Sequence, residues 1–301
     1  MFWFFLAIIG YLLLALVAIL DKFILTKSLN KPAVYTFYST IFMFGALVLW
    51  PFGAGWIYGI DWFWAIVSGL GFGFGLWTFY KAVKEGEATH IVPFNGAVIM
   101  VATYIFSSWF LNENLSGVQL TGVAILVFAS ILLTWEKSLK HQGFHSGFIW
   151  AIASGLFFAI SHVSAKYLYE IYPFLTGFMW TRVMTGFLGL FLLTFPAVRK
   201  SFIRRKKKAK TVGKRHALLI VVINKILSVG SLILIQFAAA IGSVTLVMAL
   251  AGVQYVLIFI FVYLSTKLFK KFFQEYFTKR EIAVQLVALV LVAVGSMMLV
   301  F

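Results

Sequence analysis

The sequence predicts an all-α membrane protein of ten transmembrane helices, arranged as two five-helix repeats with inverted topology. Of the 301 residues, 62% are hydrophobic and only 11% are charged, whereas about a quarter of a typical soluble domain is charged. The chain holds ten apolar runs near the length of roughly 20 residues that a spanning helix needs. These runs lack the polar–apolar alternation of membrane β-strands, so helices are favoured. The third observation is a similarity between the two halves.

The ten apolar runs are separated by short polar breaks, which set the predicted boundaries. The predicted spans cover residues 2–20, 34–52, 62–82, 88–110, 118–134, 147–168, 174–195, 217–239, 244–268 and 282–301. No basic region precedes the first run, so we expect it to be a permanent helix rather than a cleaved signal peptide. Little chain is left for a soluble domain.

Charge is concentrated in one stretch, residues 199–215, which contains ten Lys and Arg and no acidic residue. The net charge of the chain is +16. We expect this stretch to be a solvated loop that touches anionic lipid headgroups. A nucleic-acid-binding arm is the less favoured alternative, and no nucleic acid is expected as a partner. The chain has no cysteine, which excludes disulfides and cysteine-based metal sites.

The loops after the first, third, fifth, seventh and ninth spans carry nearly all of the loop Lys and Arg. By the positive-inside rule, these loops face the cytoplasm, and both termini lie outside. The sequence therefore predicts a multi-pass protein of the cytoplasmic membrane, with residues 199–215 on the cytoplasmic side.

The two halves of the chain match in two places. Residues around Lys22 align with those around Lys166 at a constant offset, where snorkelling of both lysines to the interface is the simpler explanation. The segment Glu113-Asn-Leu-Ser-Gly-Val-Gln aligns with Glu275-Tyr-Phe-Thr-Lys-Arg-Glu. In both segments the Ser or Thr is placed to cap the next helix, with Gln or Glu at the third position; a purely structural role is favoured.

These matches predict two domains, residues 1–134 and residues 145–301, of five helices each. Because five is odd, the second unit enters the membrane from the opposite side. Inverted repeats of this kind are common in secondary transporters.

These residues resemble the EamA family of the drug/metabolite transporter superfamily. The fourth helix of an EamA repeat opens with Ala-x-x-x-x-Pro and closes on a Glu-Arg-Leu-Thr-like turn. Ala88 with Pro93 and Glu113 match in the first half; in the second half, Glu275 matches but Met248 replaces the proline. The resemblance implies ten helices and the movement of amino acids, metabolites or drugs by proton coupling or exchange. It also implies cytoplasmic termini in many members, opposite to the charge pattern here.

Polar side chains inside a span are costly and are therefore candidates for function. The substrate-binding candidates are Arg182, Lys225, Gln254, Gln236, Asn95, Trp77, Tyr80 and Tyr38. We expect them around a central cavity between the repeats, where Arg182 or Lys225 holds a carboxylate or phosphate and the aromatic rings hold the rest of the solute. Structural contacts to helix-end carbonyls or to lipid headgroups are the alternative for both cations.

Two histidines, His162 and His90, are the candidates for proton coupling, because imidazole titrates near neutral pH. A hydrogen-bonded packing histidine is the alternative. No Asp or Glu lies deep in a predicted span. That absence disfavours a carboxylate-based proton relay.

The third predicted span contains glycine at every second position, at Gly69, Gly71, Gly73 and Gly75. Two overlapping small-xxx-small spacings result, which predict close helix packing; a hinge or a ligand against bare backbone is the alternative. Pro93 frees a carbonyl one turn earlier in its helix. Pro93 therefore either breaks its helix where the helix lines the cavity, or produces a kink that the helix tolerates.

Together these features predict a secondary transporter that moves a small organic solute, such as an amino acid, a metabolite or a drug-like compound, by alternating access. A non-transporting membrane sensor or assembly protein is the alternative. An intramembrane enzyme is disfavoured, because the sequence lacks a His-Glu-x-x-His motif and buried paired carboxylates. No cofactor is expected, and the oligomeric state stays open.

The charge pattern predicts the orientation directly. A fluorescent protein that matures only in the cytoplasm, inserted within residues 205–213, should fluoresce, whereas the same insertion within residues 53–60 should not. Alkaline phosphatase, which is active only outside, should give the reverse pattern. Phosphatase activity from the basic loop would overturn the predicted orientation.

Overall fold

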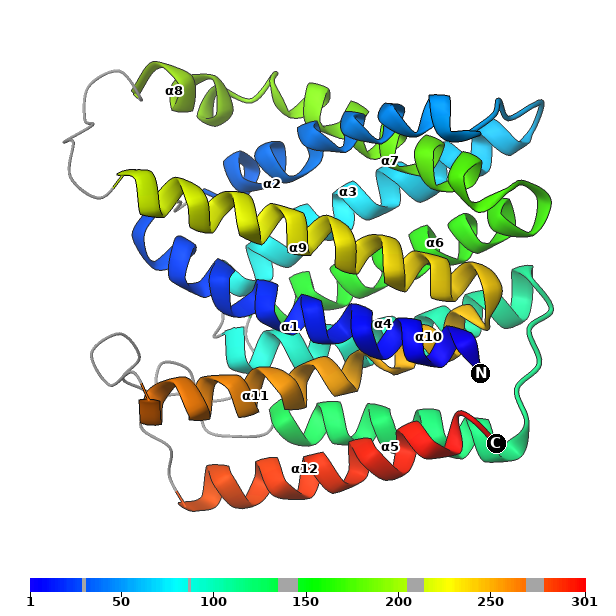
Figure 1. Ribbon diagram of the computed structural model, residues 1–301, viewed down its shortest axis with the longest axis vertical. Helices are drawn as coiled ribbons and strands as arrows, with labels where there is room; N and C mark the ends of the chain where they lie inside the picture. The colour runs from blue at the N-terminus through cyan, green and yellow to red at the C-terminus, as the bar shows by residue number, and fades with distance from the viewer. Residues whose placement is uncertain (29–30, 86–87, 135–145, 205–213, 269–278) are drawn as a thin grey trace.

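The computed structural model describes residues 1–301 except 29–30, 86–87, 135–145, 205–213 and 269–278. Every regular element in the described part of the chain is a helix, so the all-helical prediction is confirmed there. The long helices run roughly alongside one another (Figure 1). Both termini lie at the same end of the bundle, to the right in Figure 1. The connections after η1, α4, α6 and α9 lie at that end as well.

The first half of the chain forms five helical segments. They are α1 (Phe2–Ser28), α2 (Pro32–Ile41) continuing into the 3-10 helix η1 (Phe42–Phe52), α3 (Asp61–Glu85), α4 (Ala88–Phe110) and α5 (Gly117–Thr134). Pro32 occupies the first turn of α2, where its missing N–H costs nothing. Gly53 ends η1 with a φ of 98°, a left-handed conformation that favours glycine. At the start of α5, Ser116 and Gln119 form the expected reciprocal capping box, at 3.1 and 3.2 Å.

The second half contains more breaks. Its helices are α6 (Ser146–Ile171), α7 (Phe174–Leu192), α8 (Pro196–Arg204), α9 (Lys214–Ile241), α10 (Val244–Ala249), α11 (Ala251–Leu268) and α12 (Lys279–Met298). The short α8 was not expected from the sequence. Pro196 cannot donate a backbone hydrogen bond, and Arg199 Nε donates to the nearby Leu193 carbonyl at 2.8 Å. The predicted span 244–268 is interrupted at Leu250, between α10 and α11.

Each of the ten predicted spans coincides with one helix or with two consecutive helices. Within the described residues, seven segments are long and apolar enough to cross a membrane: Phe2–Leu20, Pro32–Phe52, Asp61–Glu85, Ile91–Phe110, Ser146–Ile171, Phe174–Leu192 and Ile223–Ile241. The other three predicted spans coincide with shorter apolar helices, Gly117–Leu133, Val244–Ile258 and Ala283–Met298. The chain therefore has the character of an α-helical membrane protein.

Helices α3 and α6 form a close pair near the middle of the bundle, and α7 packs against α3. Ser68 Oγ donates to the Ser161 carbonyl at 2.9 Å, and Ser161 Oγ returns a bond to the Ser68 carbonyl at 2.7 Å. About two turns away on each helix, Ser154 Oγ donates to the Gly75 carbonyl at 2.9 Å. Such bonds require the two backbones to approach closely, which only small residues at the contact permit.

The α3 glycines divide between the two neighbouring helices. A Cβ at Gly69 would clash with Met184 of α7 and lie 2.7 Å from the Thr181 carbonyl, and a Cβ at Gly73 would clash with Leu188. On the adjacent face, a Cβ at Gly71 would lie 3.1 Å from the Phe157 carbonyl of α6, and one at Gly75 would lie 2.9 Å from the Phe158 ring. Each small-xxx-small pair thus faces a different helix.

Adding a methyl group at Gly69 should destabilise the protein because backbone atoms of α7 cannot move aside. The expected loss for Gly69→Ala is on the order of 1–3 kcal/mol, typical of overpacking, seen as a lower melting temperature in detergent. Gly45→Ala is the control, since nothing lies within 4 Å of the added Cβ. Equal melting temperatures for both variants would contradict tight α3–α7 packing.

Candidate functional site

Arg182 is the most unusual side chain in the described part of the molecule. It lies in the middle of α7, is only 1% exposed, and is the largest of the fully buried side chains. Its Nε, Nη1 and Nη2 atoms have no hydrogen-bond partner among the described residues. Buried charges in proteins are normally paired. This guanidinium therefore has five donors that the described protein leaves unused.

Aromatic rings surround the guanidinium in place of acids. Its central carbon lies 4.3 Å from the centre of the Phe72 ring of α3 and 5.5 Å from that of Phe178, one turn earlier in α7. Cation–π contacts of this kind offset part of the cost of burial. They leave the N–H donors without acceptors, because a ring face replaces neither a carboxylate nor a carbonyl.

A chain of polar side chains lies close by. Tyr169 of α6 donates from its hydroxyl to Gln236 Oε1 of α9 at 3.0 Å, and Gln236 Nε2 lies 3.1 Å from His162 Nδ1. Because an amide nitrogen only donates, this arrangement assigns Nδ1 as the acceptor and makes His162 neutral. Tyr169 and His162 are both close enough to interact electrostatically with Arg182.

These six residues are hereafter the Arg182 cluster: Arg182, Phe178, Phe72, His162, Tyr169 and Gln236. They come from α3, α6, α7 and α9, so both halves of the chain contribute. Arg182 and Gln236 are each only 1% exposed. The cluster is thus an enclosed cationic site that combines hydrogen-bonding groups with aromatic rings. Chemically it suits the anionic group of a solute.

A group of tryptophans packs beside the cluster, toward the end of the bundle that holds both termini. Trp180, two residues before Arg182, packs edge-to-face on Trp56 and Trp62, with ring centres 4.8 and 4.7 Å away, and Trp50 joins them at 5.9 Å. We call these four residues the tryptophan cluster. Trp50 and Trp56 are partly exposed at its rim.

The connection at residues 53–60 is fastened to α7 beside the tryptophan cluster. Trp180 Nε1 donates to the Gly55 carbonyl at 2.9 Å, and Gly55 N–H donates to Thr176 Oγ1 at 2.8 Å. These bonds hold Gly55 against the first turns of α7. They fix this connection to the face of α7 opposite to Arg182, because residues two apart on a helix do not share a face.

The carboxylate nearest to this end of α3, Asp61, is engaged by phenols. Tyr172 donates to Asp61 Oδ2 at 2.7 Å and Tyr167 donates to Oδ1 at 3.3 Å. The bond to this carboxylate raises the pKa of Tyr172, which lies just beyond the end of α6. Asp61 therefore makes these contacts with phenols rather than with Arg182.

The structure brings two further sequence candidates, His162 and Gln236, to Arg182. The remaining cation, Lys225, is exposed on α9. It precedes Gln236 by eleven residues, about three helical turns, so both side chains lie on the same side of α9. Lys225 is thus placed nearer the end of the bundle at which α9 begins, outside the Arg182 cluster.

The described contacts of the other substrate candidates lie away from the Arg182 cluster. Asn95 Nδ2 donates to the Ala151 carbonyl at 2.8 Å, and Tyr80 pairs with Ser39 at 3.3 Å. Trp77 contacts Lys81 and Phe195, Tyr38 contacts Phe37 and Phe202, and Gln254 is half-buried in α11. A single cavity that all eight candidates line stays a prediction.

Two of the repeat-motif residues tie helices together. Lys166 Nζ donates to the Ala240 carbonyl at the end of α9, at 2.9 Å, and lies 3.5 Å from Glu170. Glu113 accepts a hydrogen bond from Thr245 at the start of α10. In α4, Pro93 lies inside a helix that continues through it. The side chains of Lys22 and His90, and all of Glu275, lie outside the described residues.

Sequence reasoning missed Phe72, Phe178 and Tyr169. Phe178 and Arg182 are four residues apart, and His162 and Tyr169 are seven apart, spacings that share one helix face. Those spacings were available from the sequence. Phe72 gave no such signal, since the chain contains 34 phenylalanines.

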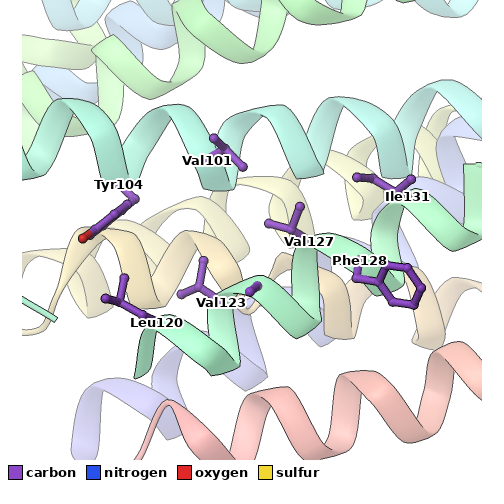
Figure 2. Close-up of a pocket in the computed structure, with 8 residues that line it drawn as sticks. Val101, Tyr104, Leu120, Val123, Val127, Phe128 and Ile131 are labelled. Atoms are coloured by element: carbon purple, nitrogen blue, oxygen red, sulfur yellow. The ribbon is translucent and has the colours of Figure 1, made fainter. Parts of the chain in front are cut away.

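A concave region between α4 and α5 differs sharply from the Arg182 cluster (Figure 2). It is an open groove of about 420 Å³ lined by Val101, Tyr104, Leu120, Val123, Ala124, Val127, Phe128 and Ile131. The Tyr104 hydroxyl is the one polar side-chain group in this lining, so the groove offers little to hold a charged solute. Among the described residues, no three His, Asp or Glu side chains gather as a metal site would require.

Comparison with known proteins supports the fold alone. No family model and no curated protein matches the chain. Among solved structures, a protein titled only "Crystal structure of protein" is similar over 98% of both chains, with a TM-score of 0.65 and 15% sequence identity. At this identity the similarity concerns the arrangement of the helices alone.

Replacing Arg182 with Met should raise the melting temperature. The change removes an unpaired buried charge while filling a similar volume. Replacing even a paired buried charge by apolar residues is often neutral or stabilising by about 1–4 kcal/mol, so removal of an unpaired one should stabilise. Arg199→Met is the matched control, because Arg199 already has a carbonyl partner and should lose stability slightly. A clear destabilisation of Arg182→Met would instead assign Arg182 a structural role.

Proposed function

We propose that this protein is a secondary transporter that moves a small organic solute with a carboxylate or phosphate group across the cytoplasmic membrane by alternating access. One observation carries the proposal: the Arg182 guanidinium is buried within an apolar helical bundle without a partner among the described residues. Amino acids, other metabolites and drug-like acids all fall within this class.

The energetics of Arg182 favour a ligand over a structural role. Ionised side chains inside a membrane are costly and usually mark a substrate pathway. A carboxylate or phosphate supplies two acceptors at once and matches the planar fork of a guanidinium. The aromatic rings of Phe72 and Phe178 would then contact the apolar part of the solute, and Tyr169 and Gln236 would add hydrogen bonds.

The helix packing supports an inverted repeat within this proposal. If α1, α3, α4 and α5 correspond to α6, α9, α10–α11 and α12, then the larger contacts among these helices should recur with the repeats exchanged. The α3–α6 contact matches α9–α1, the α4–α6 contact matches α11–α1, and the α4–α5 contact matches α11–α12. We therefore propose ten membrane crossings in two opposed units, residues 1–134 and 145–301.

This arrangement, together with the Ala88–Pro93 and Glu113 motifs, supports membership of the EamA family as part of the proposal. We further propose that the basic residues 199–215 face the cytoplasm and contact anionic headgroups, as the positive-inside rule predicts. Arg199 and Lys200, the first two of these basic residues, are exposed on α8. We propose neither a catalytic reaction nor a cofactor.

Uptake into proteoliposomes tests the proposal. The purified protein should accumulate at least one labelled solute from a panel of pyruvate, L-glutamate, L-phenylalanine, glycerol 3-phosphate and inorganic phosphate. Arg182→Gln should weaken apparent affinity for that solute about 30-fold or more, since losing one partner of a buried charge pair costs at least about 2 kcal/mol. Lys225→Gln should have a smaller effect, because Lys225 is exposed.

The control is Lys200→Gln, a charge loss on exposed α8, which should leave uptake unchanged. Normal uptake by Arg182→Gln would remove Arg182 from the site. Thermal stabilisation by a panel compound without any uptake would instead favour a non-transporting sensor, since a ligand that binds only the folded state raises its melting temperature.

A further inference from the structure

The described carboxylates give Arg182 no internal counter-ion. Asp61 binds Tyr172 and Tyr167, Glu113 accepts from Thr245, and Glu170 lies beside Lys166. The fourth described carboxylate, Glu85, is at the far end of α3. The remaining acids of the sequence are at or beyond the ends of the predicted spans. When the site is empty, its positive charge therefore has no protein partner among the described residues.

The neighbours of Arg182 also cannot cancel its charge by gaining or losing a proton in the arrangement observed. Phe72 and Phe178 do not titrate. The Tyr169 hydroxyl already donates a hydrogen bond to Gln236, and His162 accepts a hydrogen bond at Nδ1. A second positive charge on His162 would add repulsion. No described side chain therefore neutralises the site, and an anion from outside the protein is the counter-ion that we infer.

We infer that this transporter is an obligatory exchanger of organic anions, in which the empty carrier does not reorient. The inference rests on the proposed function. Alternating access passes through an occluded state in which the site is shut off from water on both sides. An occluded Arg182 without an anion would lose hydration and gain no partner, whereas the loaded site would be neutral. Reorientation is therefore fast only when the carrier is loaded.

A hydrated inorganic ion such as chloride would not serve equally well as the returning ion. The guanidinium presents parallel N–H donors, which a two-oxygen acceptor satisfies together and a spherical ion does not. The Tyr169 and Gln236 groups add further directional contacts. We therefore expect the returning ion to carry a carboxylate or phosphate group.

Efflux from proteoliposomes tests this inference. Vesicles are loaded separately with labelled pyruvate, L-glutamate, L-phenylalanine, glycerol 3-phosphate or inorganic phosphate. They are diluted into potassium chloride with or without the same unlabelled compound. Equal potassium on both sides and valinomycin hold the membrane potential at zero. Efflux should be at least about tenfold faster with the unlabelled compound outside, a factor equivalent to 1.36 kcal/mol of barrier.

Two variants separate charge from binding. Arg182→Lys keeps the buried charge, so the ratio of exchange to net efflux should stay high even though binding weakens. Arg182→Gln removes the charge, so the ratio should fall toward one at whatever residual rate remains. A high ratio in Arg182→Gln would show that another feature prevents empty reorientation and would overturn the inference.

The outcomes distinguish the two proposals. If none of the five compounds leaves the vesicles under either condition, the proposed transport function fails, and the exchange mechanism fails with it. If a compound leaves equally fast into chloride alone and into its own unlabelled solution, transport stands and obligatory organic-anion exchange is wrong. Fast efflux only into the unlabelled compound supports both.

Discussion

The close approach of α3 to α6 and α7 is the constraint on which the rest of the site depends. In a bilayer, apolar helices gain nothing from leaving water, so association relies on tight packing and interhelical hydrogen bonds. The glycines of α3 remove side chains at two contacts, and the Ser68–Ser161 pair closes one of them with two bonds. This packing sets the position of Phe72 relative to His162 and Arg182. A bulkier α3 would separate the groups that now surround the guanidinium.

Helix α7 combines these roles. Its Thr181, Met184 and Leu188 pack against the glycines of α3, its first turns hold the connection at residues 53–60, and its middle carries the buried cation. Most residues of α7 are buried, and their buried share is larger than in the other described segments that could cross a membrane. A helix at the centre of a membrane bundle can hold a charge away from lipid because its neighbours are protein on nearly every side. The position of α7 therefore explains how Arg182 is tolerated at all.

Much of the helix layout was predictable, whereas the partners of the polar residues were not. Hydropathy located the apolar runs, and the Ser116 and Gln119 pattern located a helix start, because both depend on local sequence. The break at Leu250 depends on tertiary contacts and gave no local signal. Trp77 and Tyr80 were expected beside the solute, yet they contact neighbouring helices, since aromatic residues fill space throughout this bundle. Arg182 stood out because an unpaired cation in an apolar run has few explanations.

The tryptophan cluster has a spectroscopic consequence. Indole emission depends strongly on packing and polarity, and Trp180 lies two residues from Arg182 while its ring contacts Trp56 and Trp62. Any rearrangement that moves the first turns of α7 away from residues 53–62 must separate some of these rings or release the Gly55 carbonyl from Trp180. The protein thus contains an intrinsic optical reporter of movement at this end of α7, which needs no attached dye.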